Sequence, residues 1–242
     1  MTIREPGVRV VLVRPRNPLN IGAAARAMRN FGFDDLAVVA PYEPVWQEAK
    51  SAVGAEAVLR RARAFPDLPA AIEDCTLVIG TSSLSRRQVA ETVVSLDRLP
   101  VAMPKVRQGT RLALVFGSEK TGLSNDDLSR CHFVARIPTS AACPSMNLGQ
   151  AVAVCCYELR RTLSAKRRVK NEEAPRASVG EIERLVDEIE KLRKANPGAS
   201  GSAKVQKIRL RRMFLRWPVT SREVTLALGV LRDISWRLEH NS

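Results

Sequence analysis

The sequence predicts an α/β protein built on a parallel β-sheet. Short, continuously apolar runs such as Val8–Val13 and Arg111–Phe116 are typical of strands that are covered on both faces. The first run is followed by a helical pattern and then by a second apolar run, Leu36–Ala40, which together indicate a β-α-β unit. Near residue 137 another strand leads into a helix whose apolar residues recur at helical spacing. The 242 residues can hold one such domain and an appendage.

The first helix is expected over 21–31, between these two strands. Asn20 is a suitable N-cap, and Gly32 stands where a helix commonly ends in the left-handed conformation. Between residues 46 and 65 the signals are weak. The region 84–109 is expected to be mostly loop, with a helical turn near Met103. The other elements expected before residue 117 are a short helix over 69–74 and the strands 76–80 and 111–116.

The second half begins with a tight loop after the strand that ends at Phe116. Ser124 is expected to cap a short helix that reaches residue 130, and a strand follows over 132–137. Small and kinked residues then form a loop, and Ser145-Met146-Asn147 opens a long helix. These elements place residues 1–164 in one α/β domain.

The remaining residues are expected to form a linker over 165–177 and a helical extension over 178–242. Ser178 with Glu181, and Thr220 with Glu223, have the spacing of capping boxes, and each precedes an apolar helical pattern. The last helix is expected to bury Val224, Leu228, Leu231, Ile234 and Leu238. Since this extension is too small for a core of its own, it should dock on the domain or on a second subunit.

The composition favours a polyanionic partner. The net charge is +14, and residues 165–242 carry 18 of the 39 basic residues but only 10 of the 25 acidic ones. Nucleic acid is the commonest partner of so basic a chain. Aromatic residues are only 5% of the chain, which argues against a platform of stacked bases.

The cysteines and histidines argue against a metal centre. The five cysteines show no CxxC spacing and the two histidines lie far apart, so no metal site is expected. Their odd number fits a reducing compartment. With no signal peptide and no apolar run of membrane-spanning length, a cytoplasmic location is expected.

Three loops are expected at the carboxyl ends of strands, where α/β proteins bind ligands: 17–26, 115–123 and 137–148. Gly117 and Gly122 have the spacing of a phosphate-binding loop, but Leu123-Ser124 replaces the required Lys-Ser/Thr. The chain also lacks the GxGxxG of dinucleotide-binding enzymes after its first strand and the GxSxG of hydrolases. These common chemistries are therefore not indicated.

The three loops together resemble a known family. NIGAAARAMRNFG (20–32), LVFGSEKTGLS (114–124) and IPTSAACPSMNLGQAVAVCCYELRR (137–161) are similar to the three motifs of the TrmH-like branch of the SPOUT RNA 2′-O-methyltransferases. The tail segment RLRRMFLRWPVTSREVTLALGVLRDI (209–234) resembles the helical extension of the TrmJ group, which methylates cytidine or uridine at position 32 of tRNA. The resemblance implies a SPOUT-type sheet with a C-terminal trefoil knot, S-adenosylmethionine as cofactor, tRNA as partner and a homodimer.

The resemblance also implies roles for individual residues. Arg26 corresponds to the family's catalytic arginine, and Asn20 belongs to the same motif. The residues implied to bind the cofactor are Thr81, Ser82, Gly117, Glu119, Ile137, Ser145, Met146 and Asn147. The sequence departs from the family at Ser118, where many members carry Arg, and at Cys143-Pro144, which replaces a Tyr-Ser pair.

Basic residues near the loops and in the tail are candidate RNA contacts. These are Arg14, Arg16, Arg86, Arg87, Lys207, Arg211 and Arg212, each of which could equally be a solvated surface residue. The basic run 204–216 is the best candidate for contact with the body of a tRNA. Ser145 and Asn147 could simply cap a helix, Glu119 could be a surface carboxylate, and Cys155 and Cys156 are expected to pack in a core.

The role of Arg26 has two readings. It can accept the proton of the ribose hydroxyl, although a guanidinium rarely loses its own proton, or it can stabilise the developing alkoxide. Two other functions remain open: 2′-O-methylation of another tRNA or rRNA nucleotide, and a non-catalytic RNA-binding member of the fold.

Overall fold

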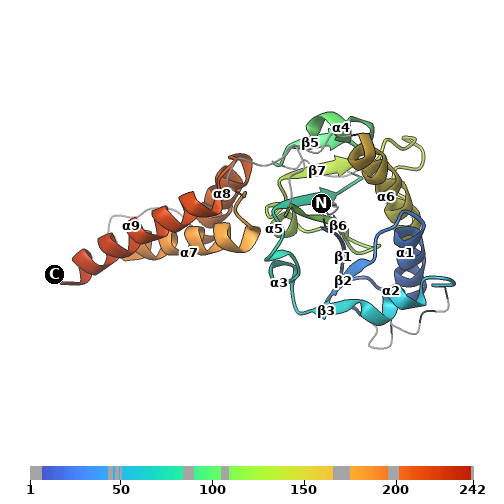
Figure 1. Cartoon of the computed structure of the whole chain (residues 1–242), viewed down its shortest axis with the longest axis horizontal. Coiled ribbons are helices and arrows are strands. Elements are labelled where there is room, and N and C mark those ends of the chain that lie inside the picture. Colours follow the sequence, from blue (N-terminus) through green and yellow to red (C-terminus); the bar gives the residue numbers. More distant parts are fainter. Residues whose placement is uncertain are drawn as a thin grey trace, which may run out of the picture.

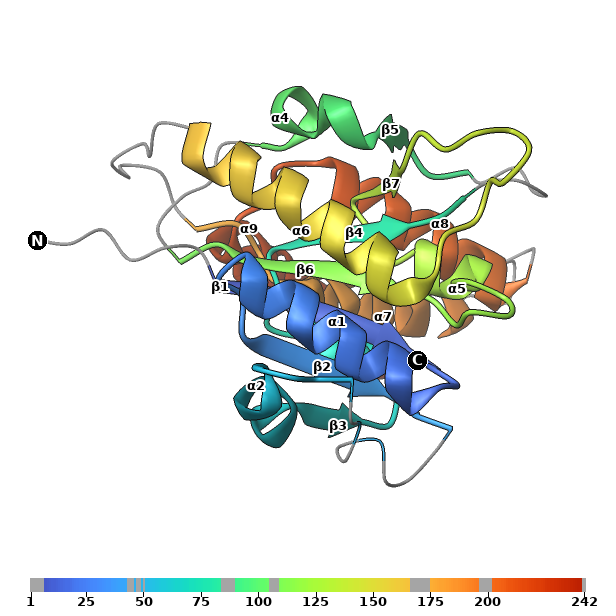
Figure 2. The same ribbon diagram turned by 90° about the vertical axis from the view of Figure 1, so that its right-hand side faces the viewer.

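A computed structural model describes residues 7–42, 46, 49, 51–83, 90–104, 109–165, 175–195 and 202–240. Its centre is a seven-stranded sheet in the order β3-β2-β1-β6-β4-β7-β5, in which every neighbouring pair is parallel (Figures 1 and 2). The α/β class and the first β-α-β unit expected from the sequence are therefore confirmed. The strands are β1 (Gly7–Val13), β2 (Asp35–Val39), β3 (Arg63–Phe65), β4 (Leu77–Thr81), β5 (Val93–Ser95), β6 (Arg111–Phe116) and β7 (Phe133–Arg136).

Helices cover both faces of the sheet. They are α1 (Pro18–Asn30), α2 (Glu56–Arg61), α3 (Leu68–Ile72), α4 (Leu99–Ala102), α5 (Asn125–Leu128), α6 (Leu148–Ala165), α7 (Val179–Ala195), α8 (Ala203–Arg216) and α9 (Ser221–His240). Side chains of α1, α2, α4 and α6 form one apolar core with the sheet, and those of α3, α5 and the three tail helices form the other. Figure 2 shows α1 and α6 side by side across the first face. None of the described helices is long and apolar enough to cross a membrane.

The first helix begins earlier than the sequence suggested. Asn17, and not Asn20, is its N-cap: the Asn17 side chain accepts a hydrogen bond from Leu19 N at 2.9 Å, and Pro18 occupies the first helical position. Proline suits this position because the missing N–H would have no partner in the helix. The earlier start leaves the side chain of Asn20 available for contacts outside the helix.

The region 84–109 contains more structure than expected. Val93–Ser95 form β5 at the edge of the sheet, and a 3-10 turn over Leu96–Arg98 leads into α4. The helical turn expected near Met103 is confirmed as α4. The strand β5 and the 3-10 turn are too short to show a hydrophobic period, which explains why the sequence favoured a loop there. Arg86 and Arg87, two candidate RNA contacts, lie outside the described residues, as does most of the expected linker 165–177.

The three helices of the tail, α7, α8 and α9, pack against the sheet as well as against one another. Val179, Ile182, Val186 and Leu215 are buried in the same core as the sheet residues Val11 and Val134. Both expected capping boxes are present, with Ser178 N donating to Glu181 at 2.7 Å and Thr220 N to Glu223 at 2.7 Å. The expected burial of Ile234 and Leu238 is wrong: they are 43% and 51% exposed. Figure 1 shows why, since α7 and α9 extend together beyond the sheet.

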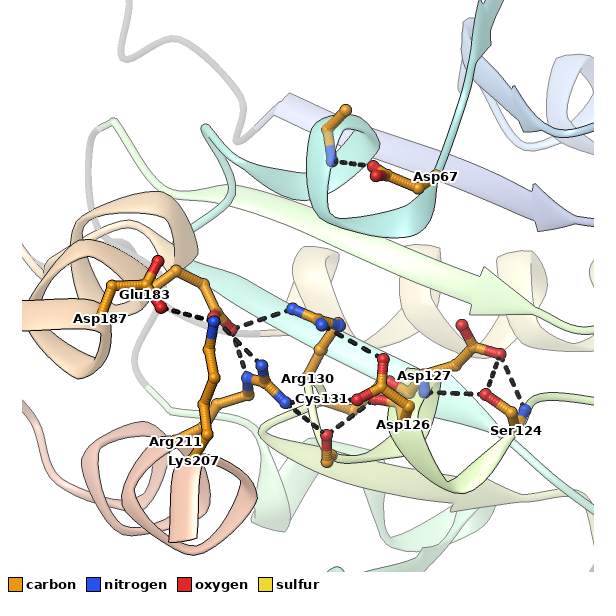
Figure 3. A network of polar contacts seen from close by, with 12 residues as sticks. Asp67, Ser124, Asp126, Asp127, Arg130, Cys131, Glu183, Asp187, Lys207 and Arg211 are labelled. Atoms are coloured by element: carbon orange, nitrogen blue, oxygen red, sulfur yellow. Dashed lines mark hydrogen bonds and ion pairs between the residues drawn. The ribbon is translucent and has the colours of Figure 1, made fainter. Parts of the chain in front are cut away.

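A network of ion pairs joins the tail to the sheet domain (Figure 3). The guanidinium of Arg211 on α8 is only 2% exposed, pairs with Glu183 on α7 and donates to Ser129 Oγ at 2.9 Å. Arg130, at the end of α5, also pairs with Glu183, at 3.1 Å. Breaking a buried pair leaves an uncompensated charge, which typically costs 3–5 kcal/mol, so Arg211 fixes how the tail docks.

We expect the protein to lose stability between about pH 6.5 and pH 4 because of His132. Burial, and then the charge of Arg176, lower the pKa of His132 from 6.5 to about 4, although its Nδ1 accepts a hydrogen bond from Val78 N at 3.0 Å. The unfolded chain therefore binds a proton in this window that the folded chain does not, and folding weakens by up to about 3 kcal/mol as the pH falls. Urea unfolding at pH 7 and pH 4.5 measures the difference. His132→Asn, whose side-chain oxygen can accept the same bond, should show a smaller one; equal losses in both proteins would contradict the assignment.

Candidate active-site cleft

A cleft of about 700 Å³ lies at the carboxyl ends of the central strands. Strands β4, β6 and β7 are adjacent in the sheet, so the loops that follow them open on the same side. The cleft is within the 300–1,000 Å³ typical of small-molecule sites. Seven residues that the family resemblance assigned to cofactor binding line it: Thr81, Ser82, Gly117, Glu119, Ile137, Ser145 and Met146.

A chain of hydrogen bonds ties the three motif loops together. Asn147 Nδ2 donates to Asn20 Oδ1 at 2.9 Å, and Asn20 Nδ2 donates to Glu119 Oε1 at 2.8 Å. Asn147 does not line the cleft itself, but its Oδ1 also caps α6 by accepting from Gly149 N at 2.9 Å. Residues 99 and 127 positions apart in the sequence are thus in direct contact. The side chain of Asn147 therefore both caps α6 and connects two of the motif loops.

Glu119 is the point where this chain meets the backbone of the first loop. Its carboxylate accepts from Arg16 N at 3.0 Å and from Asn17 N at 3.3 Å. Partial burial alone would raise the pKa of Glu119, but the hydrogen bonds from Asn20 and from backbone N–H groups outweigh it and lower the pKa below its ordinary value. Glu119 is therefore ionised at neutral pH and holds the first and second loops together, a role that a solvated surface carboxylate would not have.

Gly117 allows the second loop to fold tightly at the floor of the cleft. A Cβ atom at this position would lie 2.1 Å from the carbonyl carbon of Gly122 and 2.2 Å from Leu123 N. Both are backbone atoms, so neither can move without opening the loop. The cleft therefore requires glycine here for close approach and not for a special φ angle.

Arg26 lies outside this cleft. It is exposed on α1 and is not among the lining residues. Six residues separate it from Asn20, which corresponds to about 240° around a helix, so the two side chains leave α1 in different directions. Within the described ranges the side chain of Arg26 forms no ion pair or hydrogen bond. None of the described residues therefore competes with another molecule for its guanidinium.

Arg14 and Arg16, two candidate RNA contacts, lie beside the cleft. Arg14 adopts a positive φ of 52° at the end of β1 and forms an ion pair with the buried carboxylate of Asp127. Burial disfavours the charge on Asp127, but hydrogen bonds from Arg14 and Ser124 lower its pKa below the ordinary value. The guanidinium of Arg16 stacks over Tyr42, 5.0 Å from the ring centroid. Arg14 therefore anchors the loop, while Arg16 carries its charge at the surface.

The tail candidates differ in their access to solvent. The expectation that Arg211 contacts RNA is wrong in this fold, because its side chain is buried and paired with Glu183. Lys207 pairs with Asp187 at 2.5 Å, and Arg212 donates to Glu91 at 2.7 Å, yet both side chains stay partly exposed. Sequence reasoning could not separate these three, since the carboxylates that pair with them lie 20 to 121 positions away.

The cleft wall also includes residues to which the sequence assigned no individual role. Phe116, Ser118, Lys120 and Leu148 belong to the loops expected at strand ends, and Ala151 lies one turn further along α6. Only the packing shows that the first turns of α6 face the cleft. Ser118 is 8% exposed, and Gly122 N donates to its carbonyl at 2.8 Å. The wall thus combines apolar side chains, suited to a flat ring, with hydroxyl and carboxylate groups.

A parallel sheet with a cleft at the carboxyl ends of its central strands defines a ligand-binding α/β protein, and comparison identifies its family. The model of the SpoU rRNA Methylase family matches residues 7–157, and the chain belongs to this family. It is 34% identical over 242 residues to the tRNA (cytidine/uridine-2′-O-)-methyltransferase TrmJ of Klebsiella pneumoniae subsp. pneumoniae, covering 94% of this chain and 96% of that one. The match therefore extends through the tail.

Solved structures agree with the fold. TrmJ from Z. mobilis ZM4 superposes with a TM-score of 0.80 at 30% identity, covering 96% of this chain and all of the other. The SpoU methyltransferase AviRb from Streptomyces viridochromogenes, solved in complex with the cofactor AdoMet, has a TM-score of 0.52 at 22% identity, covering 69% and 61%. At that identity the second likeness concerns the fold alone.

Proposed function

We propose that this protein transfers a methyl group from S-adenosylmethionine to a ribose 2′-hydroxyl of tRNA. Full-length similarity to enzymes named tRNA (cytidine/uridine-2′-O-)-methyltransferase supports the reaction and the substrate class. The observation that carries the proposal is the hydrogen-bond chain Asn147–Asn20–Glu119, which joins the three motif loops around one cleft. A member of the fold that only binds RNA would have no need to keep this chain.

The cleft fits S-adenosylmethionine. Its volume of about 700 Å³ is ample, and glycine at position 117 lets the loop over 117–123 fold tightly beside it. Thr81, Ser82 and Ser145 offer hydroxyl groups, and Ile137, Met146 and Leu148 offer apolar surface for a purine ring. When bound, this molecule supplies a methyl group activated by its sulfonium charge. The residues of the cleft bind and orient it and exclude water.

The protein must also align the ribose and allow its 2′-hydroxyl group to lose a proton. An in-line displacement depends above all on alignment, which can supply about 7–11 kcal/mol of the barrier. Arg26 has no competing partner in the described structure and can stabilise the alkoxide that develops on the ribose oxygen. We favour this role over proton abstraction, because a guanidinium remains protonated below about pH 12. The proton then leaves to water or to an RNA phosphate.

We propose further that the protein acts as a homodimer with a C-terminal trefoil knot, as the family resemblance implies. The exposed position of Arg26, away from the cleft of its own chain, is consistent with a site completed by a second subunit. Val154 and Tyr157, which are 36% and 55% exposed on α6 beside α1, would be covered in such a dimer. The methyltransferase domain would comprise residues 1–164, the linker 165–177 and the helical extension 178–242.

The proposed target is the cytidine or uridine at position 32 of the anticodon loop. A second candidate is another tRNA or rRNA nucleotide, because Ser118 lines the cleft where many relatives carry Arg. We expect nucleoside mass spectrometry of tRNA incubated with the protein and S-adenosylmethionine to detect 2′-O-methylated cytidine or uridine. Nuclease mapping of the product then locates it. Ribose methylation at another tRNA position, or in rRNA alone, would replace the first candidate by the second.

A further inference from the structure

A second cavity lies where the tail meets the edge of the sheet. Its volume is about 170 Å³, and its wall includes His132, Glu91 and three arginines of α8. His132 precedes β7, so the cavity is at the amino-terminal end of this strand, whereas the candidate active-site cleft is at its carboxyl end. The four residues of β7 correspond to roughly 13 Å. We call this cavity the seam pocket; it is separate from the cleft.

The arginines of the seam pocket share one face of α8. Arg209, Arg212 and Arg216 are spaced at i, i+3 and i+7, which places them in line along a helix. Arg212 is held by Glu91, whose side chain is 4% exposed. Arg209 and Arg216 are exposed, and within the described part of the chain no carboxylate pairs with either. Among the described residues, the pocket therefore has two exposed guanidinium groups without a carboxylate partner and a single acidic side chain in its wall.

His132 adds a neutral donor to the wall. Its Nδ1 accepts a hydrogen bond from Val78 N, so the proton of the neutral ring must be on Nε2. The ring stays neutral at pH 7 because burial and the nearby charge of Arg176 disfavour the protonated form. The neutral Nε2–H of His132 and the guanidinium groups of three arginines are all donors, and among the described lining residues Glu91 is the one carboxylate. This is the chemistry that recognises a phosphate group.

We propose that the seam pocket binds a single phosphate of the tRNA backbone, gripped between α8 and the edge of the sheet. A volume of about 170 Å³ equals that of several water molecules at about 30 Å³ each, which is enough for one phosphate group. The exposure of Arg209 and Arg216 leaves the pocket open to a long polymer rather than enclosing a free ion. The proposal rests on the proposed function, because it takes tRNA to be the substrate.

The test is the salt dependence of tRNA binding by the full-length protein. Each phosphate contact contributes about 0.9 to the slope of log K against log salt. We expect Arg209→Gln and Arg216→Gln each to weaken binding and to lower the slope by about 1. Because both arginines grip the same phosphate, the double variant should also lose only about 1. The control is Arg60→Gln on α2, an exposed arginine at the opposite edge of the sheet, which should leave the slope unchanged.

Other outcomes would overturn the proposal. If the salt slope were unchanged in both single variants, the pocket would not contact a phosphate. If the slope of the double variant fell by about 2, the two arginines would contact two separate surface phosphates. Titration with inorganic phosphate at constant ionic strength tests whether the pocket binds a free phosphate ion instead. We expect inorganic phosphate to compete with tRNA for the wild-type protein but not for the double variant. Phosphate binding that depends on the two arginines, without any effect on tRNA affinity, would make the pocket a site for the free ion.

Failure of this inference can be told apart from failure of the proposed function. Substitution is used rather than removal of the tail, because a shortened chain would expose Val11, Val134 and the rest of the core that α7 and α8 cover. Binding of S-adenosylmethionine should be the same in all variants, since the cleft lies at the other end of β7. If the wild-type protein itself bound no tRNA, the proposed function would fail and not the assignment of the pocket alone.

Discussion

Arg26→Ala is expected to lower the rate of methyl transfer by about 10²–10³-fold, the usual cost of removing one group that stabilises a developing oxyanion. The physical reason is that Arg26 is exposed, lies away from the cleft of its own chain and has no side-chain partner among the described residues, so that its guanidinium can meet the ribose oxygen. Single-turnover transfer of radiolabelled methyl from S-adenosylmethionine to tRNA measures the effect. Affinities for both substrates should change little, so the loss should appear in the chemical step.

Arg26→Lys separates charge from geometry. A lysine keeps the positive charge but not the planar fork of donors, so we expect it to recover only part of the rate. Arg60→Ala, an exposed arginine on α2 at the other edge of the sheet, is the matched control and should leave the rate unchanged. Near-full turnover of Arg26→Lys, at unchanged tRNA affinity, would mean that a positive charge suffices and that the planar guanidinium is not required, whereas near-full turnover of Arg26→Ala would exclude both the electrostatic role and proton abstraction.

Gly117→Ala is expected to abolish measurable binding of S-adenosylmethionine. The new Cβ atom would lie 2.1 and 2.2 Å from backbone atoms of Gly122 and Leu123, so the loop over 117–123 has to open. Opening it displaces Glu119 and with it the contacts to Asn20 and the first loop. Isothermal titration calorimetry with S-adenosylmethionine measures the loss, and circular dichroism establishes that the sheet is still folded.

Gly229→Ala is the matched control for this substitution. Gly229 lies within α9, and apart from the neighbouring backbone of that helix no described atom is within 4 Å of the position that its Cβ would take. We expect it to bind S-adenosylmethionine normally and to gain up to about 1 kcal/mol of stability, since alanine favours a helix over glycine. If Gly117→Ala bound the cofactor as tightly as Gly229→Ala does, the second loop would not form the floor of the site.

Much of the sheet could be predicted because parallel strands buried on both faces are continuously apolar. Residues 8–13 and 111–116 were assigned to strands on this ground, and β1 and β6 lie there. The edge strand β5 could not be found, because three residues that are at least partly exposed carry no period. The three loops were also correctly expected at strand ends.

The contacts within the site could not be predicted, because they depend on the order of the strands in the sheet. Asn20 was expected to cap α1, and only the structure assigns the cap to Asn17 and leaves Asn20 between Glu119 and Asn147. The identity of the cap depends on where the helix starts, and the start differs by three residues from the one expected. A contact between residues 99 positions apart depends on tertiary packing, which local sequence spacing cannot predict.

The sequence by itself determined the class of fold, the three motif loops and the strongly basic tail, since apolar runs, turn residues and charge are local properties. The tertiary structure alone decided which charges are available. Arg211 and Arg209 are two positions apart on the same basic helix, yet the first is buried against Glu183 and Ser129 and the second is exposed at the seam pocket. Burial and pairing depend on which surfaces the fold brings together, and a basic run cannot show in advance which of its side chains will face a carboxylate.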